Sequence, residues 1–414
     1  MDEIDIPQYF LCPISLQLMK DPVTTVTGIT YDRESIEQWL ATAASGNAAA
    51  VVCPVTKQPL ASGSDLIPNH ILWRLIQAWC VANANRGIDR IPTPKSASDR
   101  SLVLKLIRDV NRSNNNILLQ LNALKKMDEL AGENEPSRRC MAEAGMAKAM
   151  VLFILRCFKE GQTLGLEKAL RILQLTWSQK AENKQLVGDN LDFIHSILWV
   201  LNSNMEKAVK IQALMALRTV LDASNWSLMQ RLNLDFFRKM VKLLKENVNT
   251  SQQAVKSLLN ILIQTCPSGR NRTKIVEAGA VFELIEMELS SPEKKISELI
   301  FCLLAQLCSC ADGRQQLLKH AGGVAVMAKR LLRVSPATDD AALSVIESLA
   351  RFAATREVAM EMLRVGAVSK LCMVLQADCA GYLKKKAREI LRLHSNVWSN
   401  SPCIQVYLVT RYPK

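Results

Sequence analysis

The stretch that decides the fold of the first domain begins Leu11-Cys12-Pro13-Ile14-Ser15-Leu16 and ends Cys53-Pro54-Val55-Thr56-Lys57-Gln58-Pro59-Leu60. Two loops of the form Cys-Pro-x therefore lie about forty residues apart, with turn residues and short apolar runs between them. Asp32 is placed to cap a helix over residues 33–42, and residues 41–50 are rich in Ala, Ser, Gly and Asn, which predicts a mobile loop. Asn69 then starts a second helix over residues 70–83. The pattern indicates a small, loop-rich α+β domain.

Two loops braced around a helix suggest a pair of structural zinc sites, which need about eight Cys or His ligands. Residues 1–85 offer only Cys12, Cys53, Cys80 and His70, and no Cys-x-x-Cys pair. We therefore predict no metal and no cofactor. Hydrogen bonds of roughly 0.5–3 kcal/mol each must hold the loops instead. The candidates for this structural network are Asp21, Asp32, Arg33, Ser35 and Thr56.

Covalent catalysis would need an activated nucleophile, and Cys12 and Cys53 are the candidates. Neither has a His nearby in the sequence, because the only His of this part is His70 on the second predicted helix. Both cysteines are better interpreted as buried apolar residues. Any catalysis by this domain is therefore expected to be non-covalent.

Residues 8–80 resemble a U-box, the zinc-free relative of the RING domain. The resemblance rests on six short sequence motifs taken together: Leu11-Cys12-Pro13-Ile14-Ser15, Met19-Lys20-Asp21-Pro22-Val23, Gly28-Ile29-Thr30-Tyr31-Asp32-Arg33, Ile36-Glu37-Gln38-Trp39-Leu40, Cys53-Pro54-Val55-Thr56 and Leu66-Ile67-Pro68-Asn69. It implies an E3 ubiquitin-protein ligase that binds a ubiquitin-charged conjugating enzyme and promotes transfer to a substrate lysine without a covalent intermediate of its own.

The resemblance also assigns roles to particular residues. It implies that the conjugating enzyme docks on Ile14, Leu16, Trp39 and Pro54. A compact group of an Ile, a Trp and a Pro beside turn residues independently suits a central anchor. Core packing remains the alternative for Ile14 and for Trp39.

Lys57 stands where the family has a basic residue that holds the ubiquitin thioester in a closed state. Many relatives have Arg at this place, which is the better bidentate donor. Lys57 is therefore a candidate stabiliser, with an idle, solvated side chain as the alternative.

The C-terminal part repeats one sequence pattern. In each copy a Gly or an Asn, two residues that tolerate a left-handed main chain, follows a short predicted helix and precedes an apolar predicted helix. The six anchors are Gly145, Asn190, Asn233, Gly279, Gly322 and Gly366, which lie 43 to 46 residues apart. Because Gly and Asn both tolerate positive φ, a left-handed helix C-cap explains their exchange. Three helices per period of about 42–45 residues is the armadillo pattern.

The domains are predicted as a U-box over residues 5–82, a Pro-containing linker over 83–100, an armadillo solenoid with a helical cap over 101–394, and a tail over 395–414 that is partly disordered. The fold class is a small α+β, zinc-free, RING-like U-box followed by an all-α armadillo-repeat solenoid. As a whole, the chain resembles the plant U-box/armadillo ubiquitin ligases, in the short subgroup that begins with the U-box.

Armadillo proteins that bind extended peptides carry an Asn ladder on their third helices. Asn260 fits that position, but the comparable residues in the preceding repeats are Leu175 and Thr219. The broken ladder argues against recognition through a peptide main chain and favours recognition of a folded protein surface. The resemblance implies that the repeats recruit the substrate, without naming the contact residues.

Charge and composition bound the remaining possibilities. The chain of 414 residues has a net charge of +13, and its first 80 residues hold four Lys/Arg against eight Asp/Glu, so the rest carries +17. No nucleic-acid motif, secretory leader or apolar run long enough for a membrane span accompanies this charge. The twelve cysteines are scattered, as in reduced proteins. We expect a cytoplasmic protein, with nuclear or membrane-peripheral locations left open.

Two other classes of function compete with the ligase. An interaction scaffold with an inactive U-box is the main alternative, although intact Ile14, Trp39 and Pro54 argue against it. A nucleic-acid or membrane binder would rest on the basic half alone. The resemblance suggests a role in plant defence signalling, and it leaves self-ubiquitination and homo-oligomerisation open.

Overall fold

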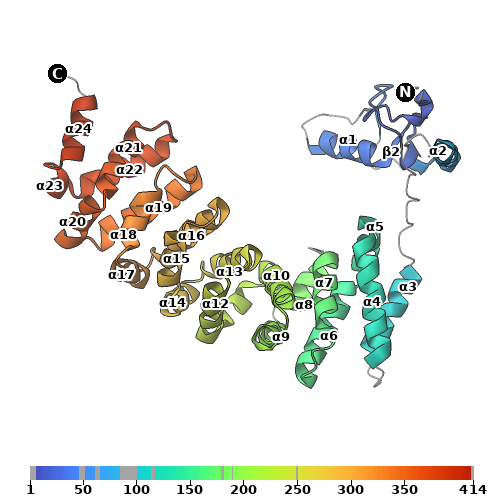
Figure 1. Cartoon of the computed structure of the whole chain (residues 1–414), viewed down its shortest axis with the longest axis horizontal. Coiled ribbons are helices and arrows are strands. Elements are labelled where there is room, and N and C mark those ends of the chain that lie inside the picture. The colour runs from blue at the N-terminus through green and yellow to red at the C-terminus, as the bar shows by residue number, and fades with distance from the viewer. Residues whose placement is uncertain are drawn as a thin grey trace. The chain divides into compact units, whose positions relative to one another are not determined.

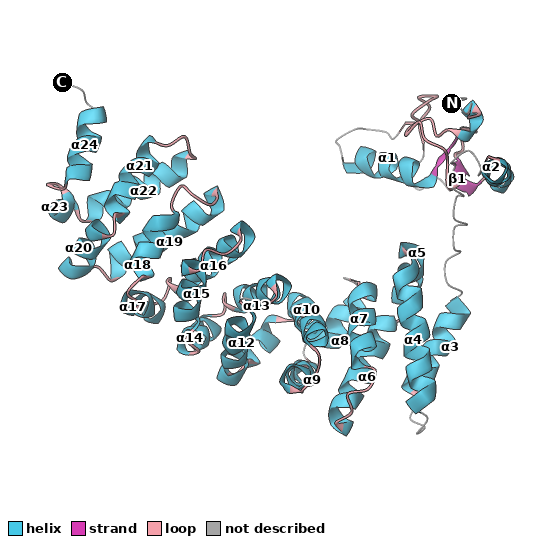
Figure 2. Ribbon diagram, in the orientation of Figure 1, coloured by secondary structure: helices cyan, strands magenta, loops and turns pink. Residues whose placement is uncertain are grey.

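The computed structural model describes residues 6–45, 52–60, 66–83, 100–112, 117–178, 181–188, 190–248 and 250–411. The chain divides into two compact units, Met1–Ser96 and Ala97–Lys414. The first unit holds a small sheet with helices, and the second is helical throughout its described residues (Figures 1 and 2). The predicted linker lies outside the described residues except for its two ends, and the predicted domain boundaries stay predictions.

The first unit is built on a three-stranded antiparallel sheet in the order β2-β1-β3. Val23 of the central strand pairs with Tyr31 on one side and with Pro68 on the other. Gly28, with φ of 77°, closes the β1–β2 hairpin, a conformation that glycine adopts without strain. The elements are η1 (Gln8–Phe10), β1 (Pro22–Thr24), β2 (Thr30–Asp32), α1 (Arg33–Ser45), β3 (Ile67–Pro68) and α2 (His70–Ala82).

Both helices of this unit begin where the sequence predicts. The N-cap of α2 is Asn69, whose Oδ1 accepts a hydrogen bond of 3.0 Å from the N–H of Leu72. Helix α1 continues to Ser45, so the loop predicted over residues 41–50 is wrong for residues 41–45; residues 46–50 lie outside the described part. Good helix formers such as Ala extend a helix cheaply, which the composition rule for loops overlooked.

The core of the first unit draws on η1, β1, β2, both helices and the loops, whereas both residues of β3 are exposed. Its buried residues are Phe10, Cys12, Met19, Val23, Tyr31, Ile36, Cys53, Leu60, Ile76 and Cys80. The two loop cysteines are thus part of the same core as the sheet and both helices.

The second unit repeats a short first helix, an apolar second helix and a long third helix, as the 43–46-residue spacing predicts. The six triplets are α5–α7 (Glu135–Glu143, Met146–Glu160, Leu166–Thr176), α8–α10 (Ala181–Gly188, Leu191–Asn202, Lys207–Ala223), α11–α13 (Trp226–Arg231, Leu234–Asn247, Gln252–Thr265), α14–α16 (Gly269–Glu277, Ala280–Leu289, Lys294–Leu307), α17–α19 (Ala311–Lys319, Gly323–Arg330, Pro336–Phe352) and α20–α22 (Arg356–Arg364, Ala367–Gln376, Gly381–Leu393).

Equivalent helices of successive triplets pack on one another. The third helices α7, α10, α13, α16, α19 and α22 form one continuous row, and the second helices contact one another in the pairs α6–α9, α12–α15, α15–α18 and α18–α21. The predicted cap consists of α3 (Arg100–Asn111) and α4 (Ile117–Glu133), which pack on α6 and α7 as a second and a third helix do. Within the described residues, the cap therefore corresponds to the second and third helices of a repeat.

The six anchors divide into two kinds. Gly145, Gly279 and Gly366 are left-handed, with φ of 86°, 85° and 80°, as predicted. Asn190 and Asn233 have φ near −90°, and the prediction is wrong for them because they act as N-caps. Their Oδ1 atoms accept from the N–H groups of Phe193 and Phe236 at 3.0 Å and 2.9 Å.

Gly322 is the third exception, with φ of −92°. Its N–H donates to Nδ1 of His320 at 3.0 Å, so a side chain two residues earlier satisfies this terminus. A second contact favours glycine here, because a Cβ at the neighbouring Gly323 would lie 2.1 Å from the Leu317 carbonyl oxygen. This repeat thus ends its first helix by close packing instead of a left-handed cap.

The predicted partial disorder of residues 395–414 is wrong for residues 395–411. They form α23 (Ser395–Trp398) and α24 (Pro402–Arg411), which pack on α20 and α21 as the first two helices of a further repeat would. Trp398 is buried, and its Nε1 donates a hydrogen bond of 3.0 Å to the Ala359 carbonyl. The expectation failed because these residues contain no Gly or Asn anchor.

Candidate functional site

The two Cys-Pro loops of the first unit have the same geometry. In the first, the N–H of Cys12 donates to the carbonyl of Gln17, and the N–H of Leu16 donates to the carbonyl of Cys12, both at 2.8 Å. In the second, Cys53 pairs with Gln58 at 2.8 Å and Lys57 with Cys53 at 3.0 Å. The sequences Cys-Pro-Ile-Ser-Leu-Gln and Cys-Pro-Val-Thr-Lys-Gln therefore superpose position by position.

Strand β2 anchors both loops through consecutive residues. The N–H of Asp32 donates to Sγ of Cys12 at 3.3 Å. The hydroxyl of Tyr31 lies 3.0 Å from Sγ of Cys53. Tyr31 reaches the second loop through its side chain and Asp32 reaches the first through its main chain, so a single strand fixes two loops that are distant in sequence.

Each loop cysteine is fully buried and is the polar centre of its loop. Sγ of Cys53 also accepts from the Thr27 hydroxyl at 3.4 Å and from the Thr56 N–H at 3.5 Å. Burial raises the pKa of the Cys53 thiol, but hydrogen bonds from Thr27, Thr56 and Tyr31 together outweigh burial and lower this pKa to about 6. The prediction of buried cysteines is right, and their role as hydrogen-bond acceptors was missed.

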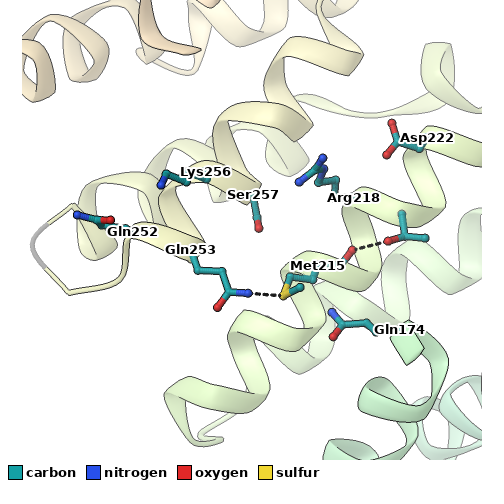
Figure 3. Close-up of a pocket in the computed structure, with 9 residues that line it drawn as sticks. Gln174, Met215, Arg218, Asp222, Gln252, Gln253, Lys256 and Ser257 are labelled. Atoms are coloured by element: carbon teal, nitrogen blue, oxygen red, sulfur yellow. Dashed lines mark hydrogen bonds between the residues drawn. The ribbon is translucent and has the colours of Figure 1, made fainter. Parts of the chain in front are cut away.

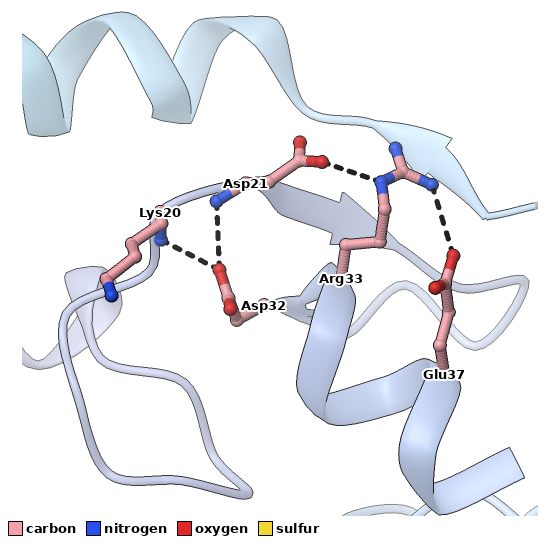
Figure 4. A network of polar contacts seen from close by, with 5 residues as sticks. All are labelled: Lys20, Asp21, Asp32, Arg33 and Glu37. Atoms are coloured by element: carbon pink, nitrogen blue, oxygen red, sulfur yellow. Dashed lines mark hydrogen bonds and ion pairs between the residues drawn. The ribbon is translucent and has the colours of Figure 1, made fainter. Parts of the chain in front are cut away.

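The predicted structural network forms around the start of α1 (Figure 4). Oδ1 of Asp32 accepts from the main-chain N–H groups of Lys20 and Asp21 at 2.7 Å and 2.9 Å. Nε of Arg33 lies 2.6 Å from Oδ2 of Asp21, and a longer contact of 3.9 Å joins Arg33 to Glu37. These contacts connect the end of the first loop to the helix.

Two members of the predicted network behave differently from expectation. The described hydrogen bonds of the Asp32 carboxylate go to Lys20 and Asp21 and not to the first turn of α1, although the helix does begin one residue after Asp32. Thr56 lies apart from the other three, in the second loop, where its hydroxyl accepts a weak hydrogen bond of 3.5 Å from the N–H of Gln58.

The four predicted docking residues lie on or beside the loops with different exposures. Leu16 is 75% exposed and Trp39 is 38% exposed. Ile14 and Pro54 are half-buried, and Ile14 also packs against the core of this unit. Nε1 of Trp39 donates to the Val52 carbonyl at 3.1 Å, which links α1 to the residue before the second loop. Ile14 and Trp39 thus serve the fold and the surface together.

Val55 belongs to this apolar surface and was missed from the sequence. It is 50% exposed and takes the same loop position as Ile14. The matching spacing of the two loop sequences could have identified it. Lys57 is exposed and takes the position of Leu16, with a left-handed main chain.

Among the described residues, no group of three or more His, Cys, Asp or Glu side chains could hold a metal ion. In the same residues, no helix has the length and apolarity to cross a bilayer. Hydrogen bonds to the two loop cysteines join both loops to β2.

The second unit has an open groove of about 610 Å³ along its row of third helices (Figure 3). Its lining comes from α7, α10 and α13 and is mainly polar: Gln174, Met215, Arg218, Thr219, Asp222, Gln252, Gln253, Lys256 and Ser257. Nε2 of Gln253 contacts Sδ of Met215 at 3.0 Å, and Lys256 pairs with Glu293 at 2.9 Å. No described residue forms an ion pair with Arg218.

The third helices carry polar side chains at the position of the Asn ladder, and these side chains form hydrogen bonds within their own helices. Nδ2 of Asn260 donates to the Lys256 carbonyl at 2.7 Å. The hydroxyl of Thr219 donates to the Met215 carbonyl at 3.0 Å. Both polar side chains thus bond to their own helix, four residues earlier, rather than projecting free donors into the groove.

Comparison with known families matches both units. The U-box domain family covers residues 6–85, and the "Plant U-box protein ARM repeat region" family covers residues 102–414. The fold and the twin-loop site therefore define a U-box/armadillo protein. The chain belongs to the plant U-box/armadillo E3 ubiquitin-protein ligases, which are RING-type (U-box) ubiquitin transferases.

Proteins that match almost the whole chain belong to the same family. The chain is 39% identical to E3 ubiquitin-protein ligase PUB24 of Arabidopsis thaliana, with 99% of this chain and 96% of the relative covered. It is 38% identical to PUB23 of the same plant, with 100% and 98% covered. Among solved structures, an engineered protein superposes on 74% of this chain and 76% of its own with a TM-score of 0.54 at 18% identity, which supports the fold alone.

Proposed function

We propose that the U-box docks a ubiquitin-charged conjugating enzyme on Ile14, Leu16, Trp39 and Pro54, with Val55 beside them. The observation that carries the proposal is the pair of matched loops, which exposes Leu16 and Val55 above a buried core. Exposed apolar side chains mark an interaction site where they gather in one patch, and the two loops that carry these residues are both held by consecutive residues of β2. Trp39 supplies the large, partly buried anchor that such interfaces favour.

Transfer on this face needs no nucleophile from the chain. The amine of a substrate lysine attacks the thioester carbonyl, the conjugating enzyme's thiol leaves, and a proton passes from the amine to solvent or to the leaving thiolate. Cys12 and Cys53 are fully buried, which agrees with a non-covalent role for the U-box. Lys57 is the candidate that holds the thioester closed, since it is the cation of the second loop.

We further propose that the solenoid recruits the substrate through the groove on α7, α10 and α13. Arg218 and the amide of Gln252 give this groove hydrogen-bonding capacity, whereas Gln174 and Gln253 already donate to the Gln212 carbonyl and to Met215 of the neighbouring helix. Because the polar ladder residues bond to their own helices, the groove suits the side chains of a folded partner better than an extended main chain.

One reaction tests the ligase mechanism. Ubiquitin, activating enzyme, conjugating enzyme and the full chain are combined with a zinc chelator throughout, and ubiquitin chains on the protein itself are measured. Chain formation that persists in chelator supports the non-covalent, metal-independent U-box. Absence of ubiquitin discharge with a panel of conjugating enzymes would favour the alternative, an interaction scaffold with an inactive U-box.

A groove variant tests recruitment separately. Arg218→Glu combined with Met215→Arg should leave self-ubiquitination intact but reduce the ubiquitinated proteins that depend on the wild-type chain in plant cells, measured by ubiquitin-remnant proteomics. Arg139→Glu, an exposed charge on α5, is the matched control. Equal profiles for groove variant and wild type would reject the groove. A cytoplasmic location, homo-oligomerisation and a role in plant defence stay predictions.

A further inference from the structure

A second recess of the solenoid lies away from the proposed substrate groove. It consists of two adjoining cavities of about 310 and 330 Å³, which share Asn202 and Lys239 in their linings. The first lies among the end of α9, the beginning of α10 and the middle of α12. The second continues along α9 toward the turn before α12. Neither cavity shares a residue with the groove of Figure 3.

The recess gathers positive charge that the protein does not neutralise. Lys207, Lys210 and Lys239 line the first cavity, and Arg231 joins Lys239 in the second. None of these four cations forms an ion pair with a described residue. They come from three different helices, so no single amphipathic face accounts for their convergence.

The two acidic residues in the linings already have cationic partners. Glu246 lies 3.9 Å from Lys242, and Asp235 lies 3.3 Å from Arg238. Both partners are outside the linings of the recess. The linings therefore hold four cations against two carboxylates, which is a net positive charge.

Lys239 shows the consequence of this crowding. Burial lowers the pKa of its ammonium group, and the like charges of Lys242 and Lys210 lower it further, against an opposing effect of Glu246. A charged group that is both partly desolvated and repelled by its neighbours is stabilised by a bound anion.

The walls of the recess complete a binding site. Leu201, Ile211, Leu214 and Leu243 provide apolar surface, which weakens competition from water and strengthens charge interactions. Asn202 lies between the cavities and offers neutral amide donors, and Asn247 and Thr250 close the far side of the first cavity.

We propose that this recess binds a small molecule bearing several phosphate groups, of the kind that an inositol polyphosphate presents. Two chambers with cations on three helices match separate phosphates better than a single carboxylate. Lysine ammonium groups bind phosphate as point charges. The lining of the second cavity also holds His195 and Phe236, of which Phe236 is 2% exposed and offers little ring surface on which a base could stack. The ligand would connect the second and third repeats.

The shared chemistry could come from a soluble inositol phosphate or from a phosphoinositide headgroup, and two arms of one experiment separate them. The full chain is titrated calorimetrically with inositol hexakisphosphate at physiological ionic strength, and sedimented with vesicles of phosphatidylcholine with and without 5% phosphatidylinositol bisphosphate. Binding in the first arm alone indicates a soluble ligand, and binding in both indicates a headgroup.

Variants decide whether the recess is the site. Lys210→Gln and Lys239→Gln should each weaken binding at least tenfold, whereas Lys148→Gln, an exposed lysine of α6 outside the recess, should change it less than twofold. Circular dichroism and self-ubiquitination without ligand verify that each variant is folded. An equal loss for all three variants, or no binding by the wild type in either arm, would overturn the proposal. So would binding of a phosphopeptide in place of the inositol phosphate.

Discussion

Leu16 and Lys57 occupy the same position in the two loops of the U-box, and both hold a left-handed main chain, with φ of 55° and 60°. Each N–H donates to the carbonyl of the cysteine four residues earlier. This conformation costs a non-glycine residue about 1–2 kcal/mol. Both side chains are exposed, so folding gains little from them. Strain retained at exposed positions is typical of functional sites, and we infer that both side chains serve the bound conjugating enzyme.

Replacing Lys57 separates its conformational cost from its charge. Lys57→Gly should stabilise the U-box by roughly 1 kcal/mol, because glycine adopts the left-handed region freely, and should slow ubiquitin discharge from the conjugating enzyme several-fold. Lys57→Arg should speed discharge, since a guanidinium donates two parallel hydrogen bonds. Single-turnover discharge onto free lysine measures both. Identical rates for all three proteins would mean that Lys57 is idle.

Trp39 is expected to be the central anchor of the docking face. Trp39→Ala should weaken binding of the conjugating enzyme by about 2–4 kcal/mol while the domain stays folded. Trp39→Phe keeps an aromatic ring but removes part of the ring surface and the 3.1 Å hydrogen bond to Val52, so it should lose less than Trp39→Ala. Ile71→Ala is the control, because Ile71 is 76% exposed on α2. Titration calorimetry gives the affinities. Undiminished ubiquitin-chain formation by Trp39→Ala would contradict the docking assignment.

Asp32 is expected to hold the first loop against α1. Asp32→Ala removes the acceptor of two main-chain N–H groups and should lower the free energy of unfolding by about 1.5–3 kcal/mol. Asp32→Asn keeps one acceptor oxygen and should lose less. Glu37→Ala, which breaks only a 3.9 Å contact, should change stability by less than about 0.5 kcal/mol. Urea unfolding of the U-box transition tests the series, and equal effects of the Asp32 and Glu37 changes would remove Asp32 from the network.

The lowered pKa of the Cys53 thiol predicts that the stability of the U-box depends on pH. Its pKa is about 6 in the folded protein, against about 8.5 for an unperturbed thiol. Between these values the unfolded chain binds more protons, so stability should rise with pH and be lost as the pH falls toward 6, by at most about 1.4 kcal/mol per pH unit. Cys53→Ser should flatten the profile over this window, because serine does not ionise. Parallel unfolding profiles from pH 6 to 9 would show that the thiol stays protonated.

The sequence predicted the architecture well because the decisive signals were periodic or counted. The regular Gly or Asn spacing led to the solenoid, and the resemblance of residues 8–80 together with the missing zinc ligands led to the U-box, which the structure and the family comparison confirm. The failures concern contacts between distant segments. Tyr31 and Thr27 reach Cys53 from 22 and 26 residues away, and Trp398 reaches Ala359 across 39. No local pattern records such pairs.

The anchors of the repeats illustrate most clearly the limit of prediction from the sequence, because Gly and Asn occupy the same position for different structural reasons. Asn233 caps α12 through its side chain, so Asn233→Ala should cost about 1 kcal/mol and Asn233→Gly only a few tenths. Gly279 is left-handed, and an added Cβ there would meet nothing within 4 Å. Gly279→Ala should therefore cost about 1–2 kcal/mol from conformation alone, and Gly279→Asn less, since Asn tolerates this region. Thermal unfolding of the four variants measures the order. If Asn233→Gly were as damaging as Asn233→Ala, the side-chain cap would not be what stabilises that repeat.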